Sequence, residues 1–147
     1  MAKKPLNLLL ADDDNDDCIF FKEALEEIPV ETELATVSNG VEVMELLLQD
    51  GKPLPDVLYL DLNMPLMNGF EVLQQIKKNK KLKKLPVIVF STSCNPDTTK
   101  QLQKEGAQYY IQKPPEFGNL KKIIHTSLLL IMKKMDKNEN VFLLNPQ

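Results

Sequence analysis

Three short apolar runs, far apart in the chain, each end at a residue of a type that binds metal ions or phosphate. The runs and the residues that follow them are 8–11 before Asp12 and Asp13, 57–60 before Asp61, and 109–112 before Lys113. Apolar runs of about four residues that stop at a polar residue are typical of buried parallel strands. Parallel strands place their carboxyl ends at one edge of a sheet, where open α/β sheets bind ligands. The pattern therefore predicts a sheet edge at which several carboxylates and one ammonium group meet.

The composition fits one folded domain followed by a short tail. The chain has 147 residues, of which 43% are hydrophobic and 27% charged, and we assign residues 1–134 to the domain and 135–147 to a C-terminal tail. The net charge of −3 argues against non-specific binding to nucleic acid or to a membrane. No signal peptide is visible, and residues 128–132 are far shorter than the ~20 residues of a membrane span. Two widely separated cysteines, Cys18 and Cys94, favour a reducing, cytoplasmic compartment.

Strand and helix patterns alternate five times along the chain. We expect strands at 6–11, 33–37, 57–61, 87–90 and 108–112, and helices at 16–28, after Asn39, from Asn68, at 95–106 and at 119–134. This alternation predicts an α/β domain with a parallel sheet covered on both faces. The flavodoxin-like, doubly wound strand order 2-1-3-4-5 then follows, with five strands, five helices and right-handed crossovers. That order brings Asp12, Asp13 and Asp61 together.

Two segments depart from this regular pattern. Residues 98–105 contain one large apolar side chain, Leu102, so we expect the fourth helix to be less stable than its neighbours and a candidate moving part. Residues 133–140 of the C-terminal region are polar, whereas residues 141–144 are apolar. Because the last helix is apolar on more than one side, we expect the tail to cover that surface, within one chain or across a dimer.

Four motifs in this order resemble the receiver domain of response regulators in two-component signalling. The motifs are Leu10-Ala11-Asp12-Asp13, Leu60-Asp61-Leu62-Asn63-Met64-Pro65 with Asn68-Gly69, Pro86-Val87-Ile88-Val89-Phe90-Ser91, and Lys113-Pro114. The resemblance covers residues 6 to about 132, and we expect no output domain after it. The chain is therefore similar to a stand-alone, chemotaxis-regulator-like receiver.

The resemblance implies a role for each motif residue. Asp61 is the phosphate acceptor, since a carboxylate at a strand end can attack phosphorus. Asp13, Asp61 and the backbone carbonyl of Asn63 bind Mg2+ directly, and Asp12 binds it through water. The magnesium site is completed by water and phosphate oxygens.

Three further residues act on the phosphoryl group or report its presence. Lys113 supplies a point charge to the phosphoryl oxygens, and Ser91 donates its hydroxyl to them. Tyr110 is the aromatic residue that changes position after phosphorylation. The resemblance also implies a cis peptide bond before Pro114.

Taken without the resemblance, the same residues have plainer interpretations. The acidic run 12–17 suits a helix N-terminus, Ser91 suits a turn, and Tyr110 suits a core position. A calcium loop is a further alternative, because Asp12, Asp14 and Asp16 alternate, but Asp17 stands where that loop needs glycine.

The function that we expect is that of a switch in a phosphorelay. A sensor histidine kinase is the phosphate donor, and the output partner is a downstream effector or a histidine phosphotransfer protein. The alternative is a relay intermediate that passes the phosphate to such a phosphotransfer protein. A phosphatase commonly has an acid two positions after its nucleophile, where this chain has Asn63, so we expect no enzyme activity beyond self-phosphorylation and self-dephosphorylation. A flavin carrier is a further alternative function, because such proteins have the same strand order and the fold alone does not choose between them. We expect the protein to be a monomer or a weak homodimer.

Overall fold

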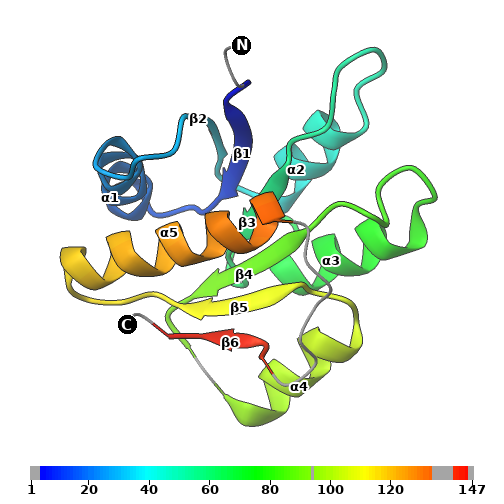
Figure 1. Ribbon diagram of the computed structural model, residues 1–147. Helices are drawn as coiled ribbons and strands as arrows, with labels where there is room; N and C mark the ends of the chain where they lie inside the picture. The colour runs from blue at the N-terminus through cyan, green and yellow to red at the C-terminus, as the bar shows by residue number, and fades with distance from the viewer. Residues whose placement is uncertain (1–3, 94, 134–140, 146–147) are drawn as a thin grey trace.

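The protein is a single parallel sheet with helices on both faces (Figure 1). The computed structural model describes residues 4–93, 95–133 and 141–145. The elements, in chain order, are β1 (Leu6–Ala11), α1 (Asn15–Glu26), β2 (Thr32–Val37), α2 (Gly40–Leu47), β3 (Val57–Leu60), α3 (Gly69–Lys78), β4 (Val87–Ser91), α4 (Pro96–Lys104), β5 (Tyr109–Gln112), α5 (Phe117–Lys133) and β6 (Leu143–Leu144). The strand order is β2-β1-β3-β4-β5-β6, which confirms the predicted doubly wound fold.

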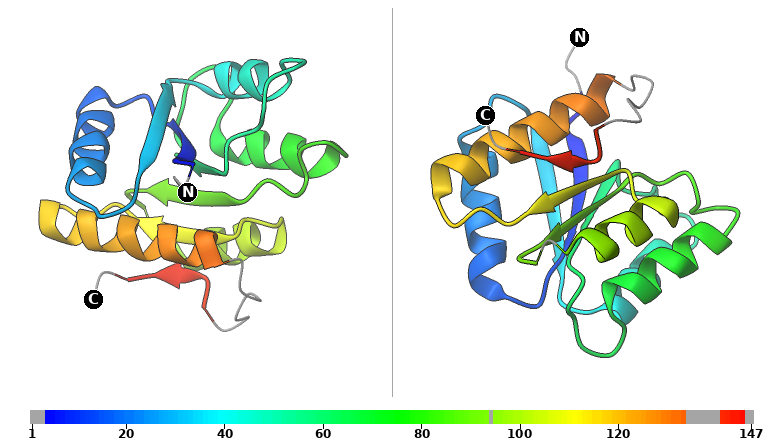
Figure 2. Two further views of the ribbon diagram at one scale, coloured as in Figure 1. Left: turned by 45° about the horizontal axis from the view of Figure 1, so that its top comes forward. Right: turned by 90° about the horizontal axis from the view of Figure 1, so that it is seen from below.

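Two apolar cores lie on opposite faces of the sheet. Helices α1 and α5 cover one face and α2, α3 and α4 cover the other, as the two views in Figure 2 show. Along β1 the side chains alternate between the two cores, with Leu8 and Leu10 in one and Leu9 and Ala11 in the other. Strands β3 and β4 are buried along their whole length, which is why their sequences are apolar without alternation.

Side chains in the loops after four successive strands cap the helices that follow. Asp14, Asn39, Asn68 and Asn95 each accept hydrogen bonds from backbone N–H groups in the first turn of the next helix. At α3 the cap is reciprocal, because the Glu71 side chain also accepts from the Asn68 N–H. These caps fix the loops at the carboxyl edge of the sheet, where the predicted site residues lie.

The described part of the C-terminal tail adds a sixth strand to the sheet. Strand β6 pairs in parallel with β5, and the Tyr110 N–H donates to the Phe142 carbonyl at 2.9 Å. Phe142 packs in one core and Leu144 in the other. The described part of the tail therefore extends the sheet beyond β5. It leaves Leu129, on the helix that the tail was expected to cover, 38% exposed. The five strands of the sequence prediction are all present, and β6 is the addition.

Two local expectations can be compared with the structure. Helix α4 buries one side chain, Leu102, as its sequence indicates. The expectation of a cis bond before Pro114 is wrong, because the peptide bonds of the described residues are all trans. The Lys113 side chain reaches the site with the trans bond, so no isomer change is needed to aim it.

Candidate acidic phosphoryl-acceptor site

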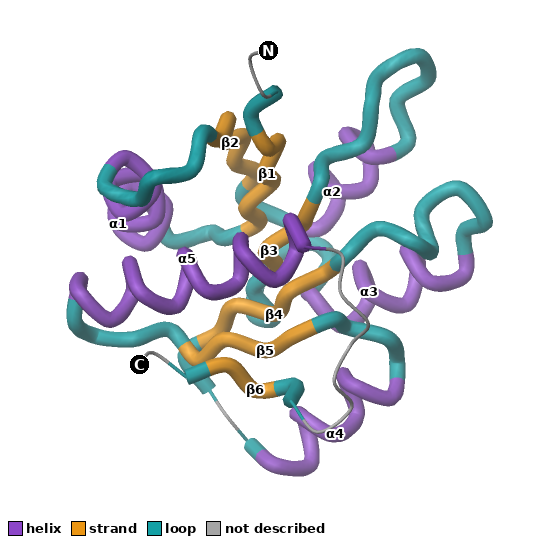
Figure 3. The backbone as a smooth tube through the Cα atoms, viewed as in Figure 1, coloured by secondary structure: helices purple, strands orange, loops and turns teal. Residues whose placement is uncertain are grey.

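Three carboxylates meet at the carboxyl ends of the adjacent strands β1 and β3. Ala11 and Leu60 are register partners, and the Asp61 N–H donates to the Ala11 carbonyl at 2.9 Å. This pairing places Asp12 and Asp61 side by side, in loops that Figure 3 shows at one edge of the sheet. Carboxylate oxygens of Asp12, Asp13 and Asp61 lie within 4.8 Å of one another. Asp12 and Asp61 are buried and Asp13 is exposed, so the cluster is open to solvent on one side.

Lys113 brings one ammonium group into this cluster from the end of β5. Its N–H donates to the Ser91 carbonyl at 2.8 Å, which fixes the backbone beside β4. The Nζ atom lies 2.7 Å from Asp12 Oδ2, 2.7 Å from Asp17 Oδ2 and 3.5 Å from Asp61 Oδ2. The Lys113 side chain is 10% exposed, so these ion pairs are largely shielded from water.

Burial and mutual proximity shift the pKa values of the cluster. Burial raises the pKa of Asp12 from 3.8 to about 6, against the lowering effect of Lys113. Burial also raises the pKa of Asp61, while Lys113 and the backbone amides of Leu62 and Asn63 lower it. Burial lowers the pKa of Lys113, but its close contacts with the Asp12 and Asp17 carboxylates outweigh burial, and its pKa lies above the usual value. The ammonium group is therefore charged throughout the physiological range.

The residues present fit a divalent cation. Asp12 Oδ2 is fully buried, forms an ion pair with Lys113 and has no hydrogen-bond partner among the described residues. The carboxylates of Asp12, Asp17 and Asp61 contact one ammonium group, and Asp13 adjoins Asp12 and Asp61, so carboxylates outnumber cations in the cluster. Oxygen ligands with one or two carboxylates are the set that Mg2+ prefers. Asp13 and Asp61 are thus suitable direct ligands, with Asp12 beside them.

The remaining predicted residues lie in β4, in β5 and in the loop after β3. Ser91 is buried at the end of β4, whereas the neighbouring Thr92 is exposed, and the role of Ser91 stays a prediction. Asn63 is exposed two positions after Asp61. Tyr110 is fully buried, and its hydroxyl donates to the Ser93 carbonyl in the loop that begins at Ser91. The switch role of Tyr110 stays a prediction.

Gly69 allows α3 to start against the acceptor loop. Its N–H donates to the Leu62 carbonyl at 2.9 Å. A Cβ atom at this position meets the Asp61 carbonyl oxygen and lies 2.9 Å from Leu62 Cα, closer than van der Waals contact permits. The Asn68-Gly69 pair therefore combines a helix cap with a close backbone approach, and both hold the loop that follows Asp61.

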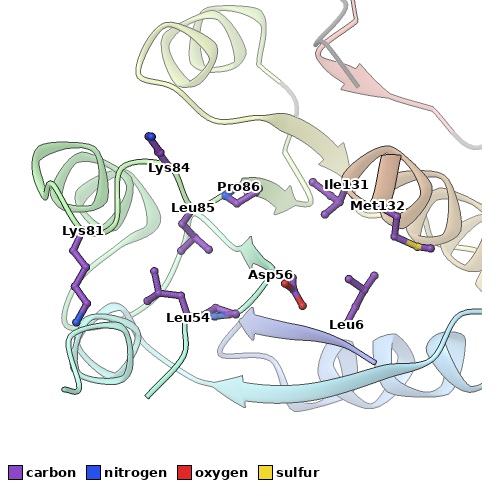
Figure 4. Close-up of a pocket in the computed structure, with 10 residues that line it drawn as sticks. Leu6, Leu54, Asp56, Lys81, Lys84, Leu85, Pro86, Ile131 and Met132 are labelled. Carbon is purple, nitrogen blue, oxygen red and sulfur yellow. The ribbon is translucent and has the colours of Figure 1, made fainter. Parts of the chain in front are cut away.

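A separate cavity opens at the opposite edge of the sheet (Figure 4). It has a volume of about 640 Å³, and its walls include Leu6, Leu54, Leu85 and Ile131. None of the predicted site residues lines it. Among the described residues, no helix combines the length and the hydropathy needed to cross a membrane.

Sequence reasoning missed two contacts of this site. Asp17 appeared only as one member of an acidic run, and no spacing rule pairs it with a lysine 96 positions later. The Ser93 carbonyl is a backbone group, so its bond to Tyr110 has no sequence signal. Both contacts depend on how the loops fold over the sheet edge.

Comparison with known proteins shows to which family the chain belongs. The family model "Response regulator receiver domain" matches residues 8–125. The curated protein Response regulator Rcp1 of Synechocystis sp. is 33% identical over 127 residues, which cover 84% of this chain and 86% of Rcp1. The probable methanogenesis regulatory protein FilR2 of Methanothrix harundinacea is 30% identical over 126 residues, covering 84% of this chain and 81% of FilR2. The chain belongs to the response regulator receiver domain family.

Solved structures agree with this assignment. The phosphorylated cyanobacterial phytochrome response regulator RcpA superimposes with a TM-score of 0.81 at 32% identity, covering 90% of this chain and 98% of RcpA. The Mn(2+)-bound form of Rcp1 superimposes with a TM-score of 0.79 at 30% identity, covering 91% and 99% of the two chains. This chain is thus a receiver domain of two-component systems, a class of domain that binds a divalent metal.

Proposed function

We propose that this protein is a phosphorelay switch whose Asp61 accepts a phosphoryl group from a sensor histidine kinase. The observation that carries the proposal is the meeting of Asp61 with two further carboxylates and Lys113 at one sheet edge. The neighbours include a phosphorylated and a manganese-bound response regulator, which supports phosphate and metal chemistry at this edge. We further propose that Mg2+ is the metal and that the chain has no enzyme activity beyond reactions of its own phosphoryl group.

The transfer step uses the Asp61 carboxylate as nucleophile. An Asp61 oxygen forms a bond to phosphorus while the bond from phosphorus to the kinase histidine nitrogen breaks, and the electron pair of that bond leaves with the imidazole. Asp13 and Asp61, with Asp12 beside them, would hold a divalent metal, which would supply positive charge to the transferred oxygens. The Asp61 Oδ1 atom accepts from the Leu62 N–H at 2.8 Å, which orients the carboxylate, and Lys113 Nζ lies 3.5 Å from Oδ2. Positioning and charge therefore supply most of the rate.

Exposed apolar side chains on segments that also carry the acidic residues support docking of a protein donor. Ile19 and Phe20 on α1 are 52% and 48% exposed, and Leu66 in the loop after β3 is 79% exposed. Apolar side chains exposed together near a reactive group are typical of interaction surfaces. Their position on the loops and helix that carry the carboxylates favours a macromolecular phosphate donor.

A short series of contacts leads from Ser91 at the end of β4 to Phe142 beside the last strand, β6. Ser91 and Ser93 hydroxyls lie 3.3 Å apart, and the Tyr110 hydroxyl donates to the Ser93 carbonyl. The Tyr110 ring packs edge-on to Phe142, with 6.2 Å between ring centroids. We propose that a phosphoryl group held by Ser91 shifts the β4–α4 loop, and that Tyr110 transmits the shift to the surface formed by α4, β5 and α5 as a change of populations.

The decisive experiment is the intact mass of the protein after incubation with acetyl phosphate, with and without Mg2+. We expect one phosphate adduct in the wild-type protein with Mg2+ and none in Asp61→Asn. Asp56→Asn is the matched control, because Asp56 precedes β3 at its opposite end and should leave the adduct unchanged. An acid-labile adduct of wild-type level in Asp61→Asn would exclude Asp61 as the acceptor. Transfer assays with a kinase and a phosphotransfer protein then separate a switch from a relay intermediate.

A further inference from the structure

Asp17 is the one carboxylate at the site for which the proposed transfer reaction has no use. It lies in the first turn of α1, and its N–H donates to the Asp14 side chain at 3.2 Å. Its Oδ2 atom accepts a hydrogen bond from Lys113 Nζ at 2.7 Å. The Asp17 side chain is 30% exposed, whereas the Asp12 side chain, the other close partner of Lys113, is fully buried.

The ammonium group is held away from the acceptor. Its Nζ lies at contact distance from Asp12 and Asp17 but 3.5 Å from Asp61. One of its N–H groups donates a hydrogen bond to Asp17, and its second short contact, with Asp12, is an ion pair. A phosphoryl group on Asp61 would therefore share Lys113 with carboxylates that already contact it more closely.

We propose that Asp17 is a positioning residue that competes with the phosphoryl group on Asp61 for the Lys113 ammonium group. The inference rests on the proposed function and adds a determinant of how firmly the phosphoryl group is held. Of the two short ion pairs, the pair with Asp17 is the one that lengthens, because its carboxylate is partly exposed and regains water at small cost. Releasing the fully buried Asp12 would leave an uncompensated charge inside the protein.

A purely structural interpretation of Asp17 makes a different prediction. An acidic residue in the first turn stabilises a helix through the macrodipole whether or not it touches a lysine. Asp16 provides the comparison, since it is acidic, exposed, in the same turn, and forms no ion pair within the described residues. If Asp17 acts only through the helix, the same amide substitution at Asp16 and Asp17 has the same effect.

The test uses beryllium fluoride with saturating Mg2+ as the phosphoryl probe, titrated by calorimetry into the full-length protein. We expect Asp17→Asn to bind the probe about 3- to 10-fold more tightly than the wild-type protein and to lengthen the half-life of its phosphate adduct by a similar factor. Affinity for Mg2+ alone should move in the opposite direction, because a negative charge leaves the site. Asp16→Asn should change probe affinity less than about twofold, and Asp17→Glu should return it toward the wild-type value.

The outcomes separate the two proposals. Equal changes in the Asp16 and Asp17 variants, or weaker probe binding by Asp17→Asn, would overturn the role of Asp17 and leave the acceptor function standing. A wild-type protein that binds neither the probe nor phosphate would overturn both proposals together.

Discussion

Replacing Asp12 by asparagine measures how much the buried Asp12 charge lowers the free energy of unfolding. Burial raises the pKa of this carboxyl from 3.8 to about 6 even though Lys113 lies 2.7 Å away. The carboxylate form is therefore less favourable in the folded protein than in the unfolded chain. Asparagine is uncharged at every pH, so we expect Asp12→Asn to be more stable than the wild-type protein when no metal is bound.

The magnitude follows from the pKa difference. A difference of one in pKa corresponds to about 1.4 kcal/mol, so the Asp12 charge costs about 3 kcal/mol at pH 7. This value is the upper bound of the gain in Asp12→Asn, because the variant also loses the contact that raises the pKa of Lys113. Because the folded pKa is the higher one, the cost is absent below pH ~4, grows as the pH rises toward 6, and is constant above that value. At pH 4.5 the same two pKa values leave a difference of about 1 kcal/mol. A gain of about 3 kcal/mol raises Tm by roughly 6–10 °C in a chain of this size.

Urea unfolding followed by circular dichroism is the assay, in EDTA at pH 7.0 and at pH 4.5. Asp13→Asn is the control, because it also removes a candidate metal ligand but from an exposed position where no burial cost is relieved. Added Mg2+ should narrow the gap between Asp12→Asn and the wild-type protein, since binding stabilises the protein with the intact ligand set. Equal stability of Asp12→Asn and wild type at pH 7.0, or the same gap at both pH values, would refute the reasoning.

Three further outcomes are expected. Mg2+ affinity, measured by calorimetry, should fall about tenfold from pH 7 to pH 5, because the Asp12 carboxyl takes up a proton below about pH 6 and binds the cation less well. Gly69→Ala should cost about 3 kcal/mol in urea unfolding, since its Cβ has no space beside the Asp61 carbonyl, and an unchanged midpoint would contradict the close approach. Phe142→Ala should cost about 3 kcal/mol and speed hydrogen exchange at the Tyr110 amide; unchanged exchange there would mean that the tail does not depend on this ring.

The sequence contained the fold because strand ends and helix starts carry local signals. The run before Asp61 is apolar since β3 is buried on both faces, and Asn68-Gly69 announces a cap and a close approach. Strand β6 could not be located this way, because two residues show no periodicity and only the apolar character of residues 141–144 indicated burial. The bond before Pro114 is trans, whereas the resemblance implied cis. The sequence could not decide between the two isomers, because cis and trans X-Pro bonds differ little in energy.

The sequence predicted which residues form the site, but it did not predict the contacts between their side chains. Asp12 and Asp61 are neighbours because β1 and β3 are neighbours, which follows from the strand order. The Lys113 ammonium group lies between Asp12 and Asp17. This position depends on the length of the lysine side chain and on the path of the loop before α1, and the spacing of residues in the sequence predicts neither.

The short last strand also bears on self-association. In the described structure β6 lies along β5, so the backbone groups of Tyr110 and Ile111 face a strand of the same chain. If β6 left, β5 would become the edge of the sheet, and an apolar edge strand is a template on which other chains add strands. Strand β6 has only two residues, so it offers a poor template itself. The tail thus closes the sheet against aggregation by edge-to-edge pairing.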